Sequence, residues 1–275
     1  KAAFRYANLN VAGICCPTCK ARTGKLLYTV TSAEAAQHFV LKEVDHNRNL
    51  ALAEHIAELW GQTTCDVISC DVCGVIFANP YVGGDSIFYT LAFTRTHYPA
   101  WKWEYQRTLD TIKDIVALAD HPLKFLEIGA GDGAFVRKIS PGLTLKDNIL
   151  CLEYSEYGRN RILDYGIKCQ GDDIRNLNLP KAGGGFDMIC LFQVLEHMDR
   201  LDALFGKLNA LSNSQAHLFI SVPNAEQIEF NETHGCLLDM PPNHIGRWNL
   251  PAFKKLGATF GWAINEYQTE PFNLK

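Results

Sequence analysis

From about residue 122 onward, short apolar runs alternate with segments whose apolar residues recur at helical spacing. The apolar runs predict strands at 123–128, 148–153, 166–170, 186–192 and 216–222. The segments between them predict helices, for instance at 133–139, 155–164 and 198–211. Strands that alternate with helices indicate an α/β fold, a Rossmann-like doubly wound parallel sheet with helices on both faces. Ligands of such sheets bind beyond the carboxyl ends of the strands.

Before residue 122 the pattern is mainly helical. Residues 32–61 are rich in Ala, Leu and Glu, and their apolar residues recur at helical spacing up to Gly61. This predicts one or two helices with Ser32 as an N-cap. A long helix is expected over 98–120, with Tyr98, Trp101 and Tyr105 near its start, and Tyr89 lies in the segment before it. These rings either pack against the sheet or cover a bound cofactor.

The ten cysteines are concentrated near the start of the chain. The chain contains two C-x-x-C pairs, "CPTC" at 16–19 and "CDVC" at 70–73. In each pair a single tight turn lets two thiolates coordinate the same metal ion. Together they predict a four-sulfur structural zinc site on Cys16, Cys19, Cys70 and Cys73. The alternatives are a redox pair, or replacement of one thiolate by His38, His46 or His55. Cys15 and Cys65 fall outside the spacing and are not expected to be ligands.

These patterns predict three parts along the chain. They are a zinc-binding cysteine module with a helical insertion at 1–82, a linking aromatic helix region at 83–121, and the α/β domain at 122–275.

Composition narrows the choice of partners. The net charge is −4 and the sequence pI is about 6.1, so the basic excess of a nucleic-acid-binding protein is missing. No apolar run approaches the roughly 20 residues of a membrane span, and no signal-peptide core is visible. We therefore expect a cytoplasmic protein with a small-molecule ligand; the sequence does not indicate an oligomeric state.

A glycine-rich turn follows the first strand of the α/β pattern. "GAGDGA" at 129–134 satisfies the G-x-G-x-x-[GA] pattern of dinucleotide sites. However, Glu127 before the turn and Asp132 inside it would repel a pyrophosphate. Two carboxylates suit a ligand that carries a cationic group and an ammonium, such as S-adenosylmethionine.

The next strand ends also carry polar residues. Glu153, after "ILCL", can accept hydrogen bonds from both hydroxyls of a ribose, which fits NAD as well as S-adenosylmethionine. Asp173, with Asp172 as the alternative, can accept from an adenine amino group while Ile174 lies against the ring. Gln193 ends the fourth strand and is expected beside the methyl donor.

Residues 123–270 resemble a class I S-adenosylmethionine-dependent methyltransferase. The resemblance rests on "LEIGAGDG", "CLEYS", "GDDIRNL", "FDMICLFQVLEHM" and "LFISVPN", which occur in the family's order and spacing. It implies donor contacts from Glu127, Gly129, Ala130 and Gly131 around the methionine, Glu153 and Tyr154 at the ribose, Asp173 and Ile174 at the adenine, and Phe192 and Gln193 beside the methyl group.

Two further features bear on this resemblance. The cysteine module is similar to the zinc-binding front domain of bacterial methyltransferases that act on nucleotide-linked sugars or secondary metabolites. The family's sheet usually ends with a sixth strand and an antiparallel seventh. "WAINEYQTE" at 262–270 is expected to supply the sixth, whereas "PFNLK" is too short for a seventh.

Methyl transfer to a hydroxyl or to a carbon acid is helped by a base, and histidine titrates in the right range. His244 in "PPNH" and His197 in "LEHM" are the candidate catalytic residues. Alternatively, His197 only holds its loop, and the base is His234 or Glu232. "PPNHIGRW" is expected to be a rigid loop that presents polar groups, Arg247 among them.

The acceptor is expected to be a small molecule, such as a nucleotide-linked sugar or a natural-product intermediate. Methylation of RNA or protein and a non-catalytic donor-binding scaffold are the alternatives. An NAD-dependent dehydrogenase is disfavoured, because the rest of the chain offers no second nucleotide-binding half and no catalytic domain.

Overall fold

A computed structural model of the chain describes residues 7–93, 98, 100–140, 142–178, 184–237 and 239–271. They form two compact units, each made of distant segments. The front unit lies within Lys1–Thr96, Glu196–Leu201 and Val222–Tyr267, and the α/β unit within His97–Leu195, Asp202–Ser221 and Gln268–Lys275. The contiguous division at 1–82, 83–121 and 122–275 remains a proposal about which parts fold alone.

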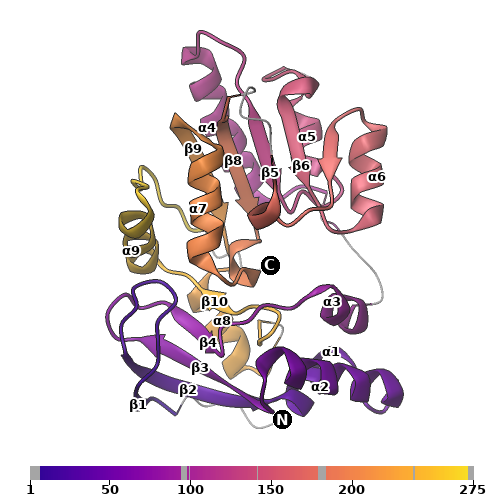
Figure 1. Ribbon diagram of the computed structural model, residues 1–275, viewed down its shortest axis with the longest axis vertical. Helices are drawn as coiled ribbons and strands as arrows, with labels where there is room; N and C mark the ends of the chain where they lie inside the picture. Colours follow the sequence, from indigo (N-terminus) through magenta and orange to yellow (C-terminus); the bar gives the residue numbers. More distant parts are fainter. Residues whose placement is uncertain are drawn as a thin grey trace. The chain divides into compact units, whose positions relative to one another are not determined.

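An antiparallel five-stranded sheet is the frame of the front unit, in the order β1-β2-β3-β4-β10 (Figure 1). The strands are β1 (Leu9–Ala12), β2 (Thr23–Thr31), β3 (Thr64–Cys70), β4 (Ile76–Asn79) and β10 (Gly246–Arg247). β10 comes from far along the chain and pairs with β4, placing Gly246 opposite Phe77. A strand of two residues is too short to leave an alternating pattern in a sequence.

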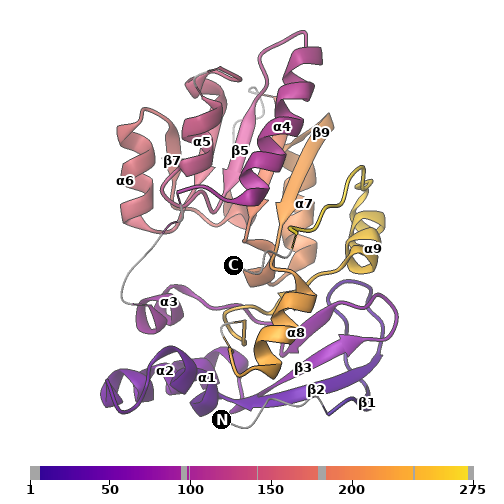
Figure 2. The same cartoon turned by 180° about the vertical axis from the view of Figure 1, so that it is seen from behind.

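Five helices belong to the front unit: α1 (Ser32–Phe39), α2 (His46–Trp60), α3 (Ser86–Ala92), α8 (Ala225–Thr233) and α9 (Leu250–Phe260). The helices expected within 32–61 are confirmed as α1 and α2, which lie side by side in Figures 1 and 2. The N-cap of α1 is Thr31, not the expected Ser32. Thr31 and Glu34 form a capping box, in which each side chain accepts a hydrogen bond from the other residue's backbone N–H.

The α/β unit contains a five-stranded parallel sheet in the order β7-β6-β5-β8-β9. All five expected strands are confirmed with shifted ends: β5 (Phe125–Ile128), β6 (Ile149–Leu152), β7 (Lys168–Gln170), β8 (Phe186–Phe192) and β9 (Ser212–Ser221). The strand order changes direction between β5 and β8, which is the switch point where such sheets bind ligands.

Helices cover both faces of this sheet. They are α4 (Trp103–Leu118), α5 (Ala134–Ile139), α6 (Glu156–Asp164) and α7 (Leu201–Leu211), with the short 3-10 turns η1 (Lys146–Asn148), η2 (Ile174–Asn176) and η4 (Leu195–His197). Figure 1 shows α7 over one face, and Figure 2 shows α4 and α5 over the other. Every residue of β5 is buried, as expected for a parallel strand covered on both sides.

Two sequence expectations near the ends of the α/β pattern are wrong in detail. The helix expected over 98–120 begins at Trp103 and ends at Leu118. Residues 262–270, expected to form a sixth strand, form no strand. The last four residues of "PFNLK" lie outside the described residues.

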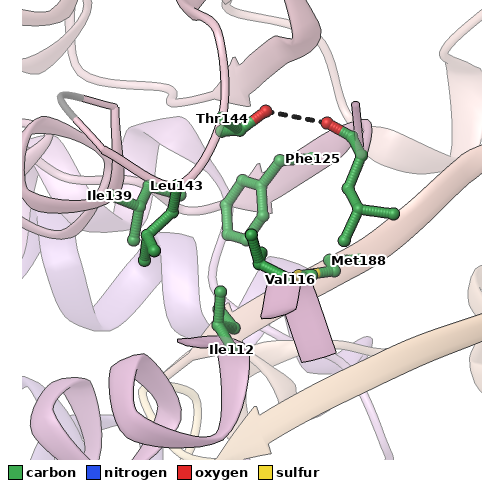
Figure 3. A pocket seen from close by; sticks show the side chains of 8 residues that line it. Ile112, Val116, Phe125, Ile139, Leu143, Thr144 and Met188 are labelled. Carbon is green, nitrogen blue, oxygen red and sulfur yellow. Dashed lines mark hydrogen bonds between the residues drawn. The ribbon is translucent and has the colours of Figure 1, made fainter. Parts of the chain in front are cut away.

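A small apolar cavity of about 10 Å³ lies between α4, α5 and the start of the sheet (Figure 3). It is lined by Ile112, Val116, Leu123, Phe125, Ile139, Leu143, Thr144 and Met188. Phe125 begins β5, so the cavity lies at the end of that strand opposite the glycine-rich turn. Its size and lining identify a gap in core packing. Among the described residues, no helix is long and apolar enough to cross a membrane.

Candidate active site and metal centre

The four predicted metal-binding cysteines lie together in the front unit. Their sulfurs are all within 4.8 Å of one another, and Cys16 Sγ–Cys73 Sγ and Cys19 Sγ–Cys70 Sγ are 3.7 and 3.5 Å apart. Sulfurs about 2.3 Å from a tetrahedral zinc ion stand about 3.8 Å apart. The cysteines are free thiols and not disulfides. Their spacing therefore fits a four-coordinate metal.

The two C-x-x-C turns have the same backbone design. Lys20 N donates to Cys16 O and Gly74 N donates to Cys70 O, both at 3.0 Å. Lys20 and Gly74, which each follow the second cysteine of a pair, both have a left-handed φ, of 61° and 71°. The hydrogen bond between Cys16 and Cys73, opposed by burial, lowers the pKa of the Cys16 thiol to about 5.

The glycine-rich turn of the α/β unit is packed so closely that its glycines cannot carry side chains. A Cβ on Gly129 would lie 2.5 Å from Val194 Cγ2, and one on Gly131 would lie 2.9 Å from the Tyr98 ring. Both glycines also have a left-handed φ, of 69° and 58°. Only glycine fits at both positions, because Val194 and Tyr98 pack directly against the backbone of the turn. Ala130, between them, is buried.

Glu153 lies beside this turn, just past the end of β6. Its carboxylate accepts hydrogen bonds from Gly131 N and Ser155 N at 2.8 Å, and from the Tyr98 hydroxyl at 3.3 Å. Burial raises the pKa of Glu153, although the two backbone bonds work against that rise. The chain thus fixes the orientation of this carboxylate. Tyr154, the next residue, is exposed.

Glu127 is the one charged residue inside β5. Its side chain is 1% exposed, and neither carboxylate oxygen has a hydrogen-bond partner within the described part of the chain. Burial, followed by the nearby charge of Glu153, raises the pKa of Glu127 well above its usual range. A buried carboxylate without a partner is costly. A cationic ligand group beside it would remove that cost.

The third strand end differs from expectation. Asp173 caps η2 through Arg175 N, and its two oxygens also accept from Arg175 Nε at 2.9 Å. Burial raises the pKa of Asp173, but these bonds from Arg175 outweigh it and the net pKa is lowered. Ile174 is buried, whereas the alternative Asp172 is exposed. An adenine bound here would share Asp173 with Arg175.

The fourth strand ends in a strained residue. Gln193 has a left-handed φ of 57°, which is uncommon outside glycine and is often found at functional sites. Its amide donates to Glu104 Oε1 at 3.3 Å and to Ser221 Oγ at 3.4 Å. The side chain of Phe192 instead packs in the core between Tyr105 and Phe135. Tyr105 is therefore a core residue.

The two candidate catalytic histidines lie together in the front unit. Their ring centroids are 4.6 Å apart. His197 Nδ1 lies 2.6 Å from Asn243 O and 3.0 Å from the Tyr89 hydroxyl. Because a carbonyl only accepts, Nδ1 of His197 is the protonated nitrogen. Burial, followed by the neighbouring His244, lowers the pKa of His197 to about 3.

His244 has its own carboxylate partner. Its Nδ1 lies 2.8 Å from Asp239 Oδ1, and both side chains are nearly buried. The backbone next to His244 is hydrogen-bonded to Glu196, because Ile245 N donates to Glu196 O at 2.8 Å. Sequence patterns do not identify Tyr89 or Asp239 as histidine partners. Tyr89 is far from His197 in the sequence, and Asp239 lies in a loop segment without a periodic pattern.

The expectation that "PPNHIGRW" presents its polar groups is wrong for Arg247 and Trp248, which are 3% and 2% exposed. Arg247 forms a two-pronged ion pair with Glu232, with Nη1–Oε2 at 2.8 Å and Nη2–Oε1 at 2.5 Å. Glu232 is itself fully buried, so the structure does not place it in a polar loop. His234 is hydrogen-bonded to Phe230 O at the end of α8.

A family model described as "Methyltransferase domain" matches residues 100–267, more than half of the chain. No curated protein matches the sequence.

Several solved structures have a similar fold. An amino pentose methyltransferase from Micromonospora echinaspora is 17% identical, with 49% of this chain and 61% of that chain covered and a TM-score of 0.37. The plantazolicin methyltransferase BpumL is 17% identical, with 57% and 63% covered and a TM-score of 0.44. Magnesium protoporphyrin IX methyltransferase from Synechocystis PCC 6803 is 18% identical, with 59% and 75% covered and a TM-score of 0.45. The chain thus spans less than two thirds of the first two structures, and this likeness concerns the fold alone.

Proposed function

The chain belongs to the methyltransferase-domain family, and we propose that it transfers the methyl group of S-adenosylmethionine to a small-molecule acceptor. The buried carboxylate of Glu127 carries this proposal. It lies at the switch point of the sheet and has no hydrogen-bond partner among the described residues. The α-ammonium of the donor supplies the positive charge that this carboxylate lacks.

Residues next to Glu127 are assigned to the methionine and ribose parts of the donor. The turn formed by Gly129, Ala130 and Gly131 directly follows β5, and we place the methionine part of the donor there. The fixed carboxylate of Glu153 accepts from the ribose hydroxyls, with Tyr154 beside it. When bound, the sulfonium supplies an activated methyl group, so the protein has to align the acceptor and exclude water.

The adenine and the methyl group complete this assignment. Asp173 accepts from the adenine amino group while Ile174 packs against the ring. Gln193, held by Glu104 and Ser221, lines the site near the methyl group. Phe192 contributes through its backbone, because its side chain belongs to the core.

We assign a structural zinc ion to Cys16, Cys19, Cys70 and Cys73. Four thiolates fill every position of a tetrahedral zinc ion, so no position remains for a substrate. The site joins the segment before β2 to the turn between β3 and β4, two stretches of the front sheet that are far apart in the sequence. Its role in the protein is to hold that sheet.

The acceptor chemistry is assigned to His197 and His244. Asp239 Oδ1 lies 2.8 Å from His244 Nδ1, and a carboxylate at this distance favours the tautomer with the proton on Nδ1. The Nε2 of His244 is the nitrogen left to act on an acceptor. His197 is held in the same way by Asn243 O. The net charge of −4 favours a small molecule over RNA as the acceptor.

Native mass spectrometry of the purified chain, with and without S-adenosylmethionine or S-adenosylhomocysteine, tests the donor and the zinc together. We expect one zinc and one nucleoside per chain. Glu153→Ala should weaken donor binding about tenfold, because it removes a charge-assisted hydrogen bond worth roughly 1–2 kcal/mol. Glu156→Ala is the matched control, since Glu156 is exposed three residues away. Zinc without any nucleoside, even at high donor concentration, would refute the donor assignment.

Turnover is tested separately. Purified protein is incubated with radiolabelled donor and a panel of nucleotide-linked sugars and other hydroxylated small molecules. His244→Ala should lower methyl transfer while the donor dissociation constant is unchanged. Label that appears only in RNA or protein fractions would overturn the small-molecule assignment.

A further inference from the structure

A second group of metal-ligating side chains lies in the front unit, apart from the four cysteines. One ligand atom each from Glu196, His197 and His244 lies within 4.8 Å of the other two. His197 Nε2 is 3.9 Å from Glu196 Oε1. Two ligands with bonds of about 2.0–2.2 Å to one ion stand roughly 3–4 Å apart, so the His197–Glu196 pair already fits a shared ion, and a contraction of at most about 1 Å brings the whole group into this range.

Both histidines are oriented as metal ligands are. Imidazoles that bind metals almost always donate their other ring N–H to a carbonyl or a carboxylate. His197 Nδ1 donates to Asn243 O at 2.6 Å, which leaves the Nε2 lone pair of His197 for a metal. His244 Nδ1 lies 2.8 Å from Asp239 Oδ1 without the angle of a hydrogen bond, and a small rotation of the ring would complete the same arrangement there.

The third ligand and the access route also fit. The Glu196 side chain is 1% exposed, whereas those of His197 and His244 are 26% and 12% exposed. A buried carboxylate backing two partly exposed imidazoles leaves a side from which an ion can enter. The two segments that carry the ligands are already tied together, because Ile245 N donates to Glu196 O.

We propose that Glu196, His197 and His244 bind a divalent transition-metal ion, with Asp239 and the Asn243 carbonyl orienting the two imidazoles. Two imidazoles and one carboxylate suit Zn²⁺, Fe²⁺, Co²⁺ or Ni²⁺ better than Mg²⁺ or Ca²⁺, which prefer oxygen ligands. Three protein ligands leave at least one position open, in contrast to the four-cysteine site. That position takes an oxygen atom of water or of a bound molecule.

If the proposed methyl transfer is correct, the open position gives this ion a specific use. An acceptor hydroxyl held there would lose its proton to water more readily, as metal-bound water does. His244 then acts as a ligand and not as a free base. The metal-binding proposal itself does not depend on this use.

Metal content measures the site without any assay of activity. The full chain, purified with the four-cysteine zinc in place, is incubated with Co²⁺, passed through a desalting column and analysed by inductively coupled plasma mass spectrometry. We expect two metal ions per wild-type chain, one zinc and one cobalt. His197→Ala and His244→Ala should each retain the zinc and lose the cobalt, so the zinc reports that the front unit is still folded.

Two further variants sharpen the result. Asp239→Asn should weaken Co²⁺ binding about 10- to 100-fold, the usual effect of changing a group that orients a metal ligand. His46→Ala is the matched control, because His46 is exposed on α2, and it should bind two ions. A wild-type chain that holds only zinc, or histidine variants that bind Co²⁺ as the wild type does, would overturn the proposal. Donor binding measured on the same samples separates this failure from a failure of the proposed function, because Glu153→Ala should lose donor affinity and keep both ions.

Discussion

The front unit and the α/β unit are both built on five-stranded sheets, but they place their buried polar groups differently. In the front unit, four cysteines and the Tyr28–Glu232–Arg247 network connect segments that are far apart in the sequence. In the α/β unit, the sheet is covered by an apolar core, and the buried carboxylate of Glu127 and the half-buried carboxylate of Glu153 lie at the carboxyl ends of β5 and β6. The cysteines and the network of the first unit link distant segments, whereas the carboxylates of the second unit are those we propose to contact the donor.

A small antiparallel sheet with short strands needs such stabilising polar groups more than a doubly wound parallel sheet does. The front sheet includes two strands of four residues and one of two, which bury little apolar surface each. The α/β sheet instead has helices on both faces. Substitutions in the polar groups of the two units should therefore give different kinds of defect.

The largest effect is expected from breaking the four-cysteine site. Cys70→Ser should abolish zinc binding and unfold the front sheet, because structural zinc sites contribute on the order of 10 kcal/mol to folding. Hydrogen exchange followed by mass spectrometry should show rapid exchange in peptides from β2 and β3 and slow exchange in peptides from β5 and β6.

Cys15→Ser is the matched control for this substitution. Cys15 is exposed and adjoins Cys16, but it does not belong to the four-sulfur group. It should keep the wild-type exchange pattern. Equal loss of protection in β5 and β6 in the Cys70→Ser protein would contradict the separation of the two units.

The buried ion pair should have the next largest effect. Arg247→Met leaves Glu232 buried without its guanidinium, and such a change costs about 3–5 kcal/mol. Urea denaturation should report this loss in the free energy of unfolding of the front unit. The double variant Arg247→Met/Glu232→Leu should recover part of it, because no charge is then left buried.

Arg200→Met is the control for that pair. Arg200 is exposed and lies 3.4 Å from Asp199, and an exposed ion pair is worth about 0–1 kcal/mol. A loss in Arg247→Met no larger than in Arg200→Met would show that the buried pair does not hold the front sheet.

Glu127→Gln should act in the opposite direction on stability. Because the pKa of Glu127 is raised in the folded chain, folding favours its protonated form. This group therefore costs stability increasingly as the pH rises above its usual pKa of 4.5. The melting temperature of Glu127→Gln should exceed that of the wild type at pH 7, and the difference should shrink towards pH 5.

Donor binding should show the reverse dependence. The ammonium of the donor favours ionised Glu127, so binding releases a proton and the wild-type dissociation constant should fall between pH 5 and pH 7. In Glu127→Gln, binding should be about 10- to 100-fold weaker at pH 7 and nearly independent of pH, since a charge-assisted bond of roughly 1.5–3 kcal/mol is missing. Calorimetry in buffers of different ionisation enthalpy measures the proton directly. Wild-type binding without proton release would contradict the role assigned to Glu127.

Sequence reasoning was most successful where local patterns are long. The apolar runs of the α/β unit predict all five parallel strands, and the C-x-x-C spacing predicts a sulfur cluster that the structure brings together. Side-chain clusters and strand pairs that join distant parts of the chain could not be predicted from the sequence. β10 has two residues, and the Tyr28–Glu232–Arg247 network joins positions more than 200 residues apart, so neither leaves a periodic signal.

The site residues show the same limit. A short local motif marks each of the expected strand-end residues Glu127 and Glu153 and the glycines of the turn. Their expected positions at strand ends agree with the structure. Asp239 and Tyr89, by contrast, matter only because folding places them against His244 and His197. Arg247 was misjudged because a guanidinium in a Pro-rich segment resembles an exposed loop residue until its buried partner is known.

The smallest expected effect concerns Tyr98, whose hydroxyl donates to Glu153 Oε1 over a long 3.3 Å. That bond occupies the oxygen we assign to the ribose, while the Tyr98 ring lies over Gly131. Tyr98→Phe keeps the ring and removes the competing hydroxyl, so donor binding should tighten about threefold, a part of the 0.5–1.5 kcal/mol of an ordinary hydrogen bond. Tyr98→Ala should instead weaken binding, because it also removes the apolar cover. The same calorimetry distinguishes the alternative. Weaker donor binding in Tyr98→Phe would mean that the hydroxyl contacts the donor itself, so that a residue outside the strands contributes to the donor site.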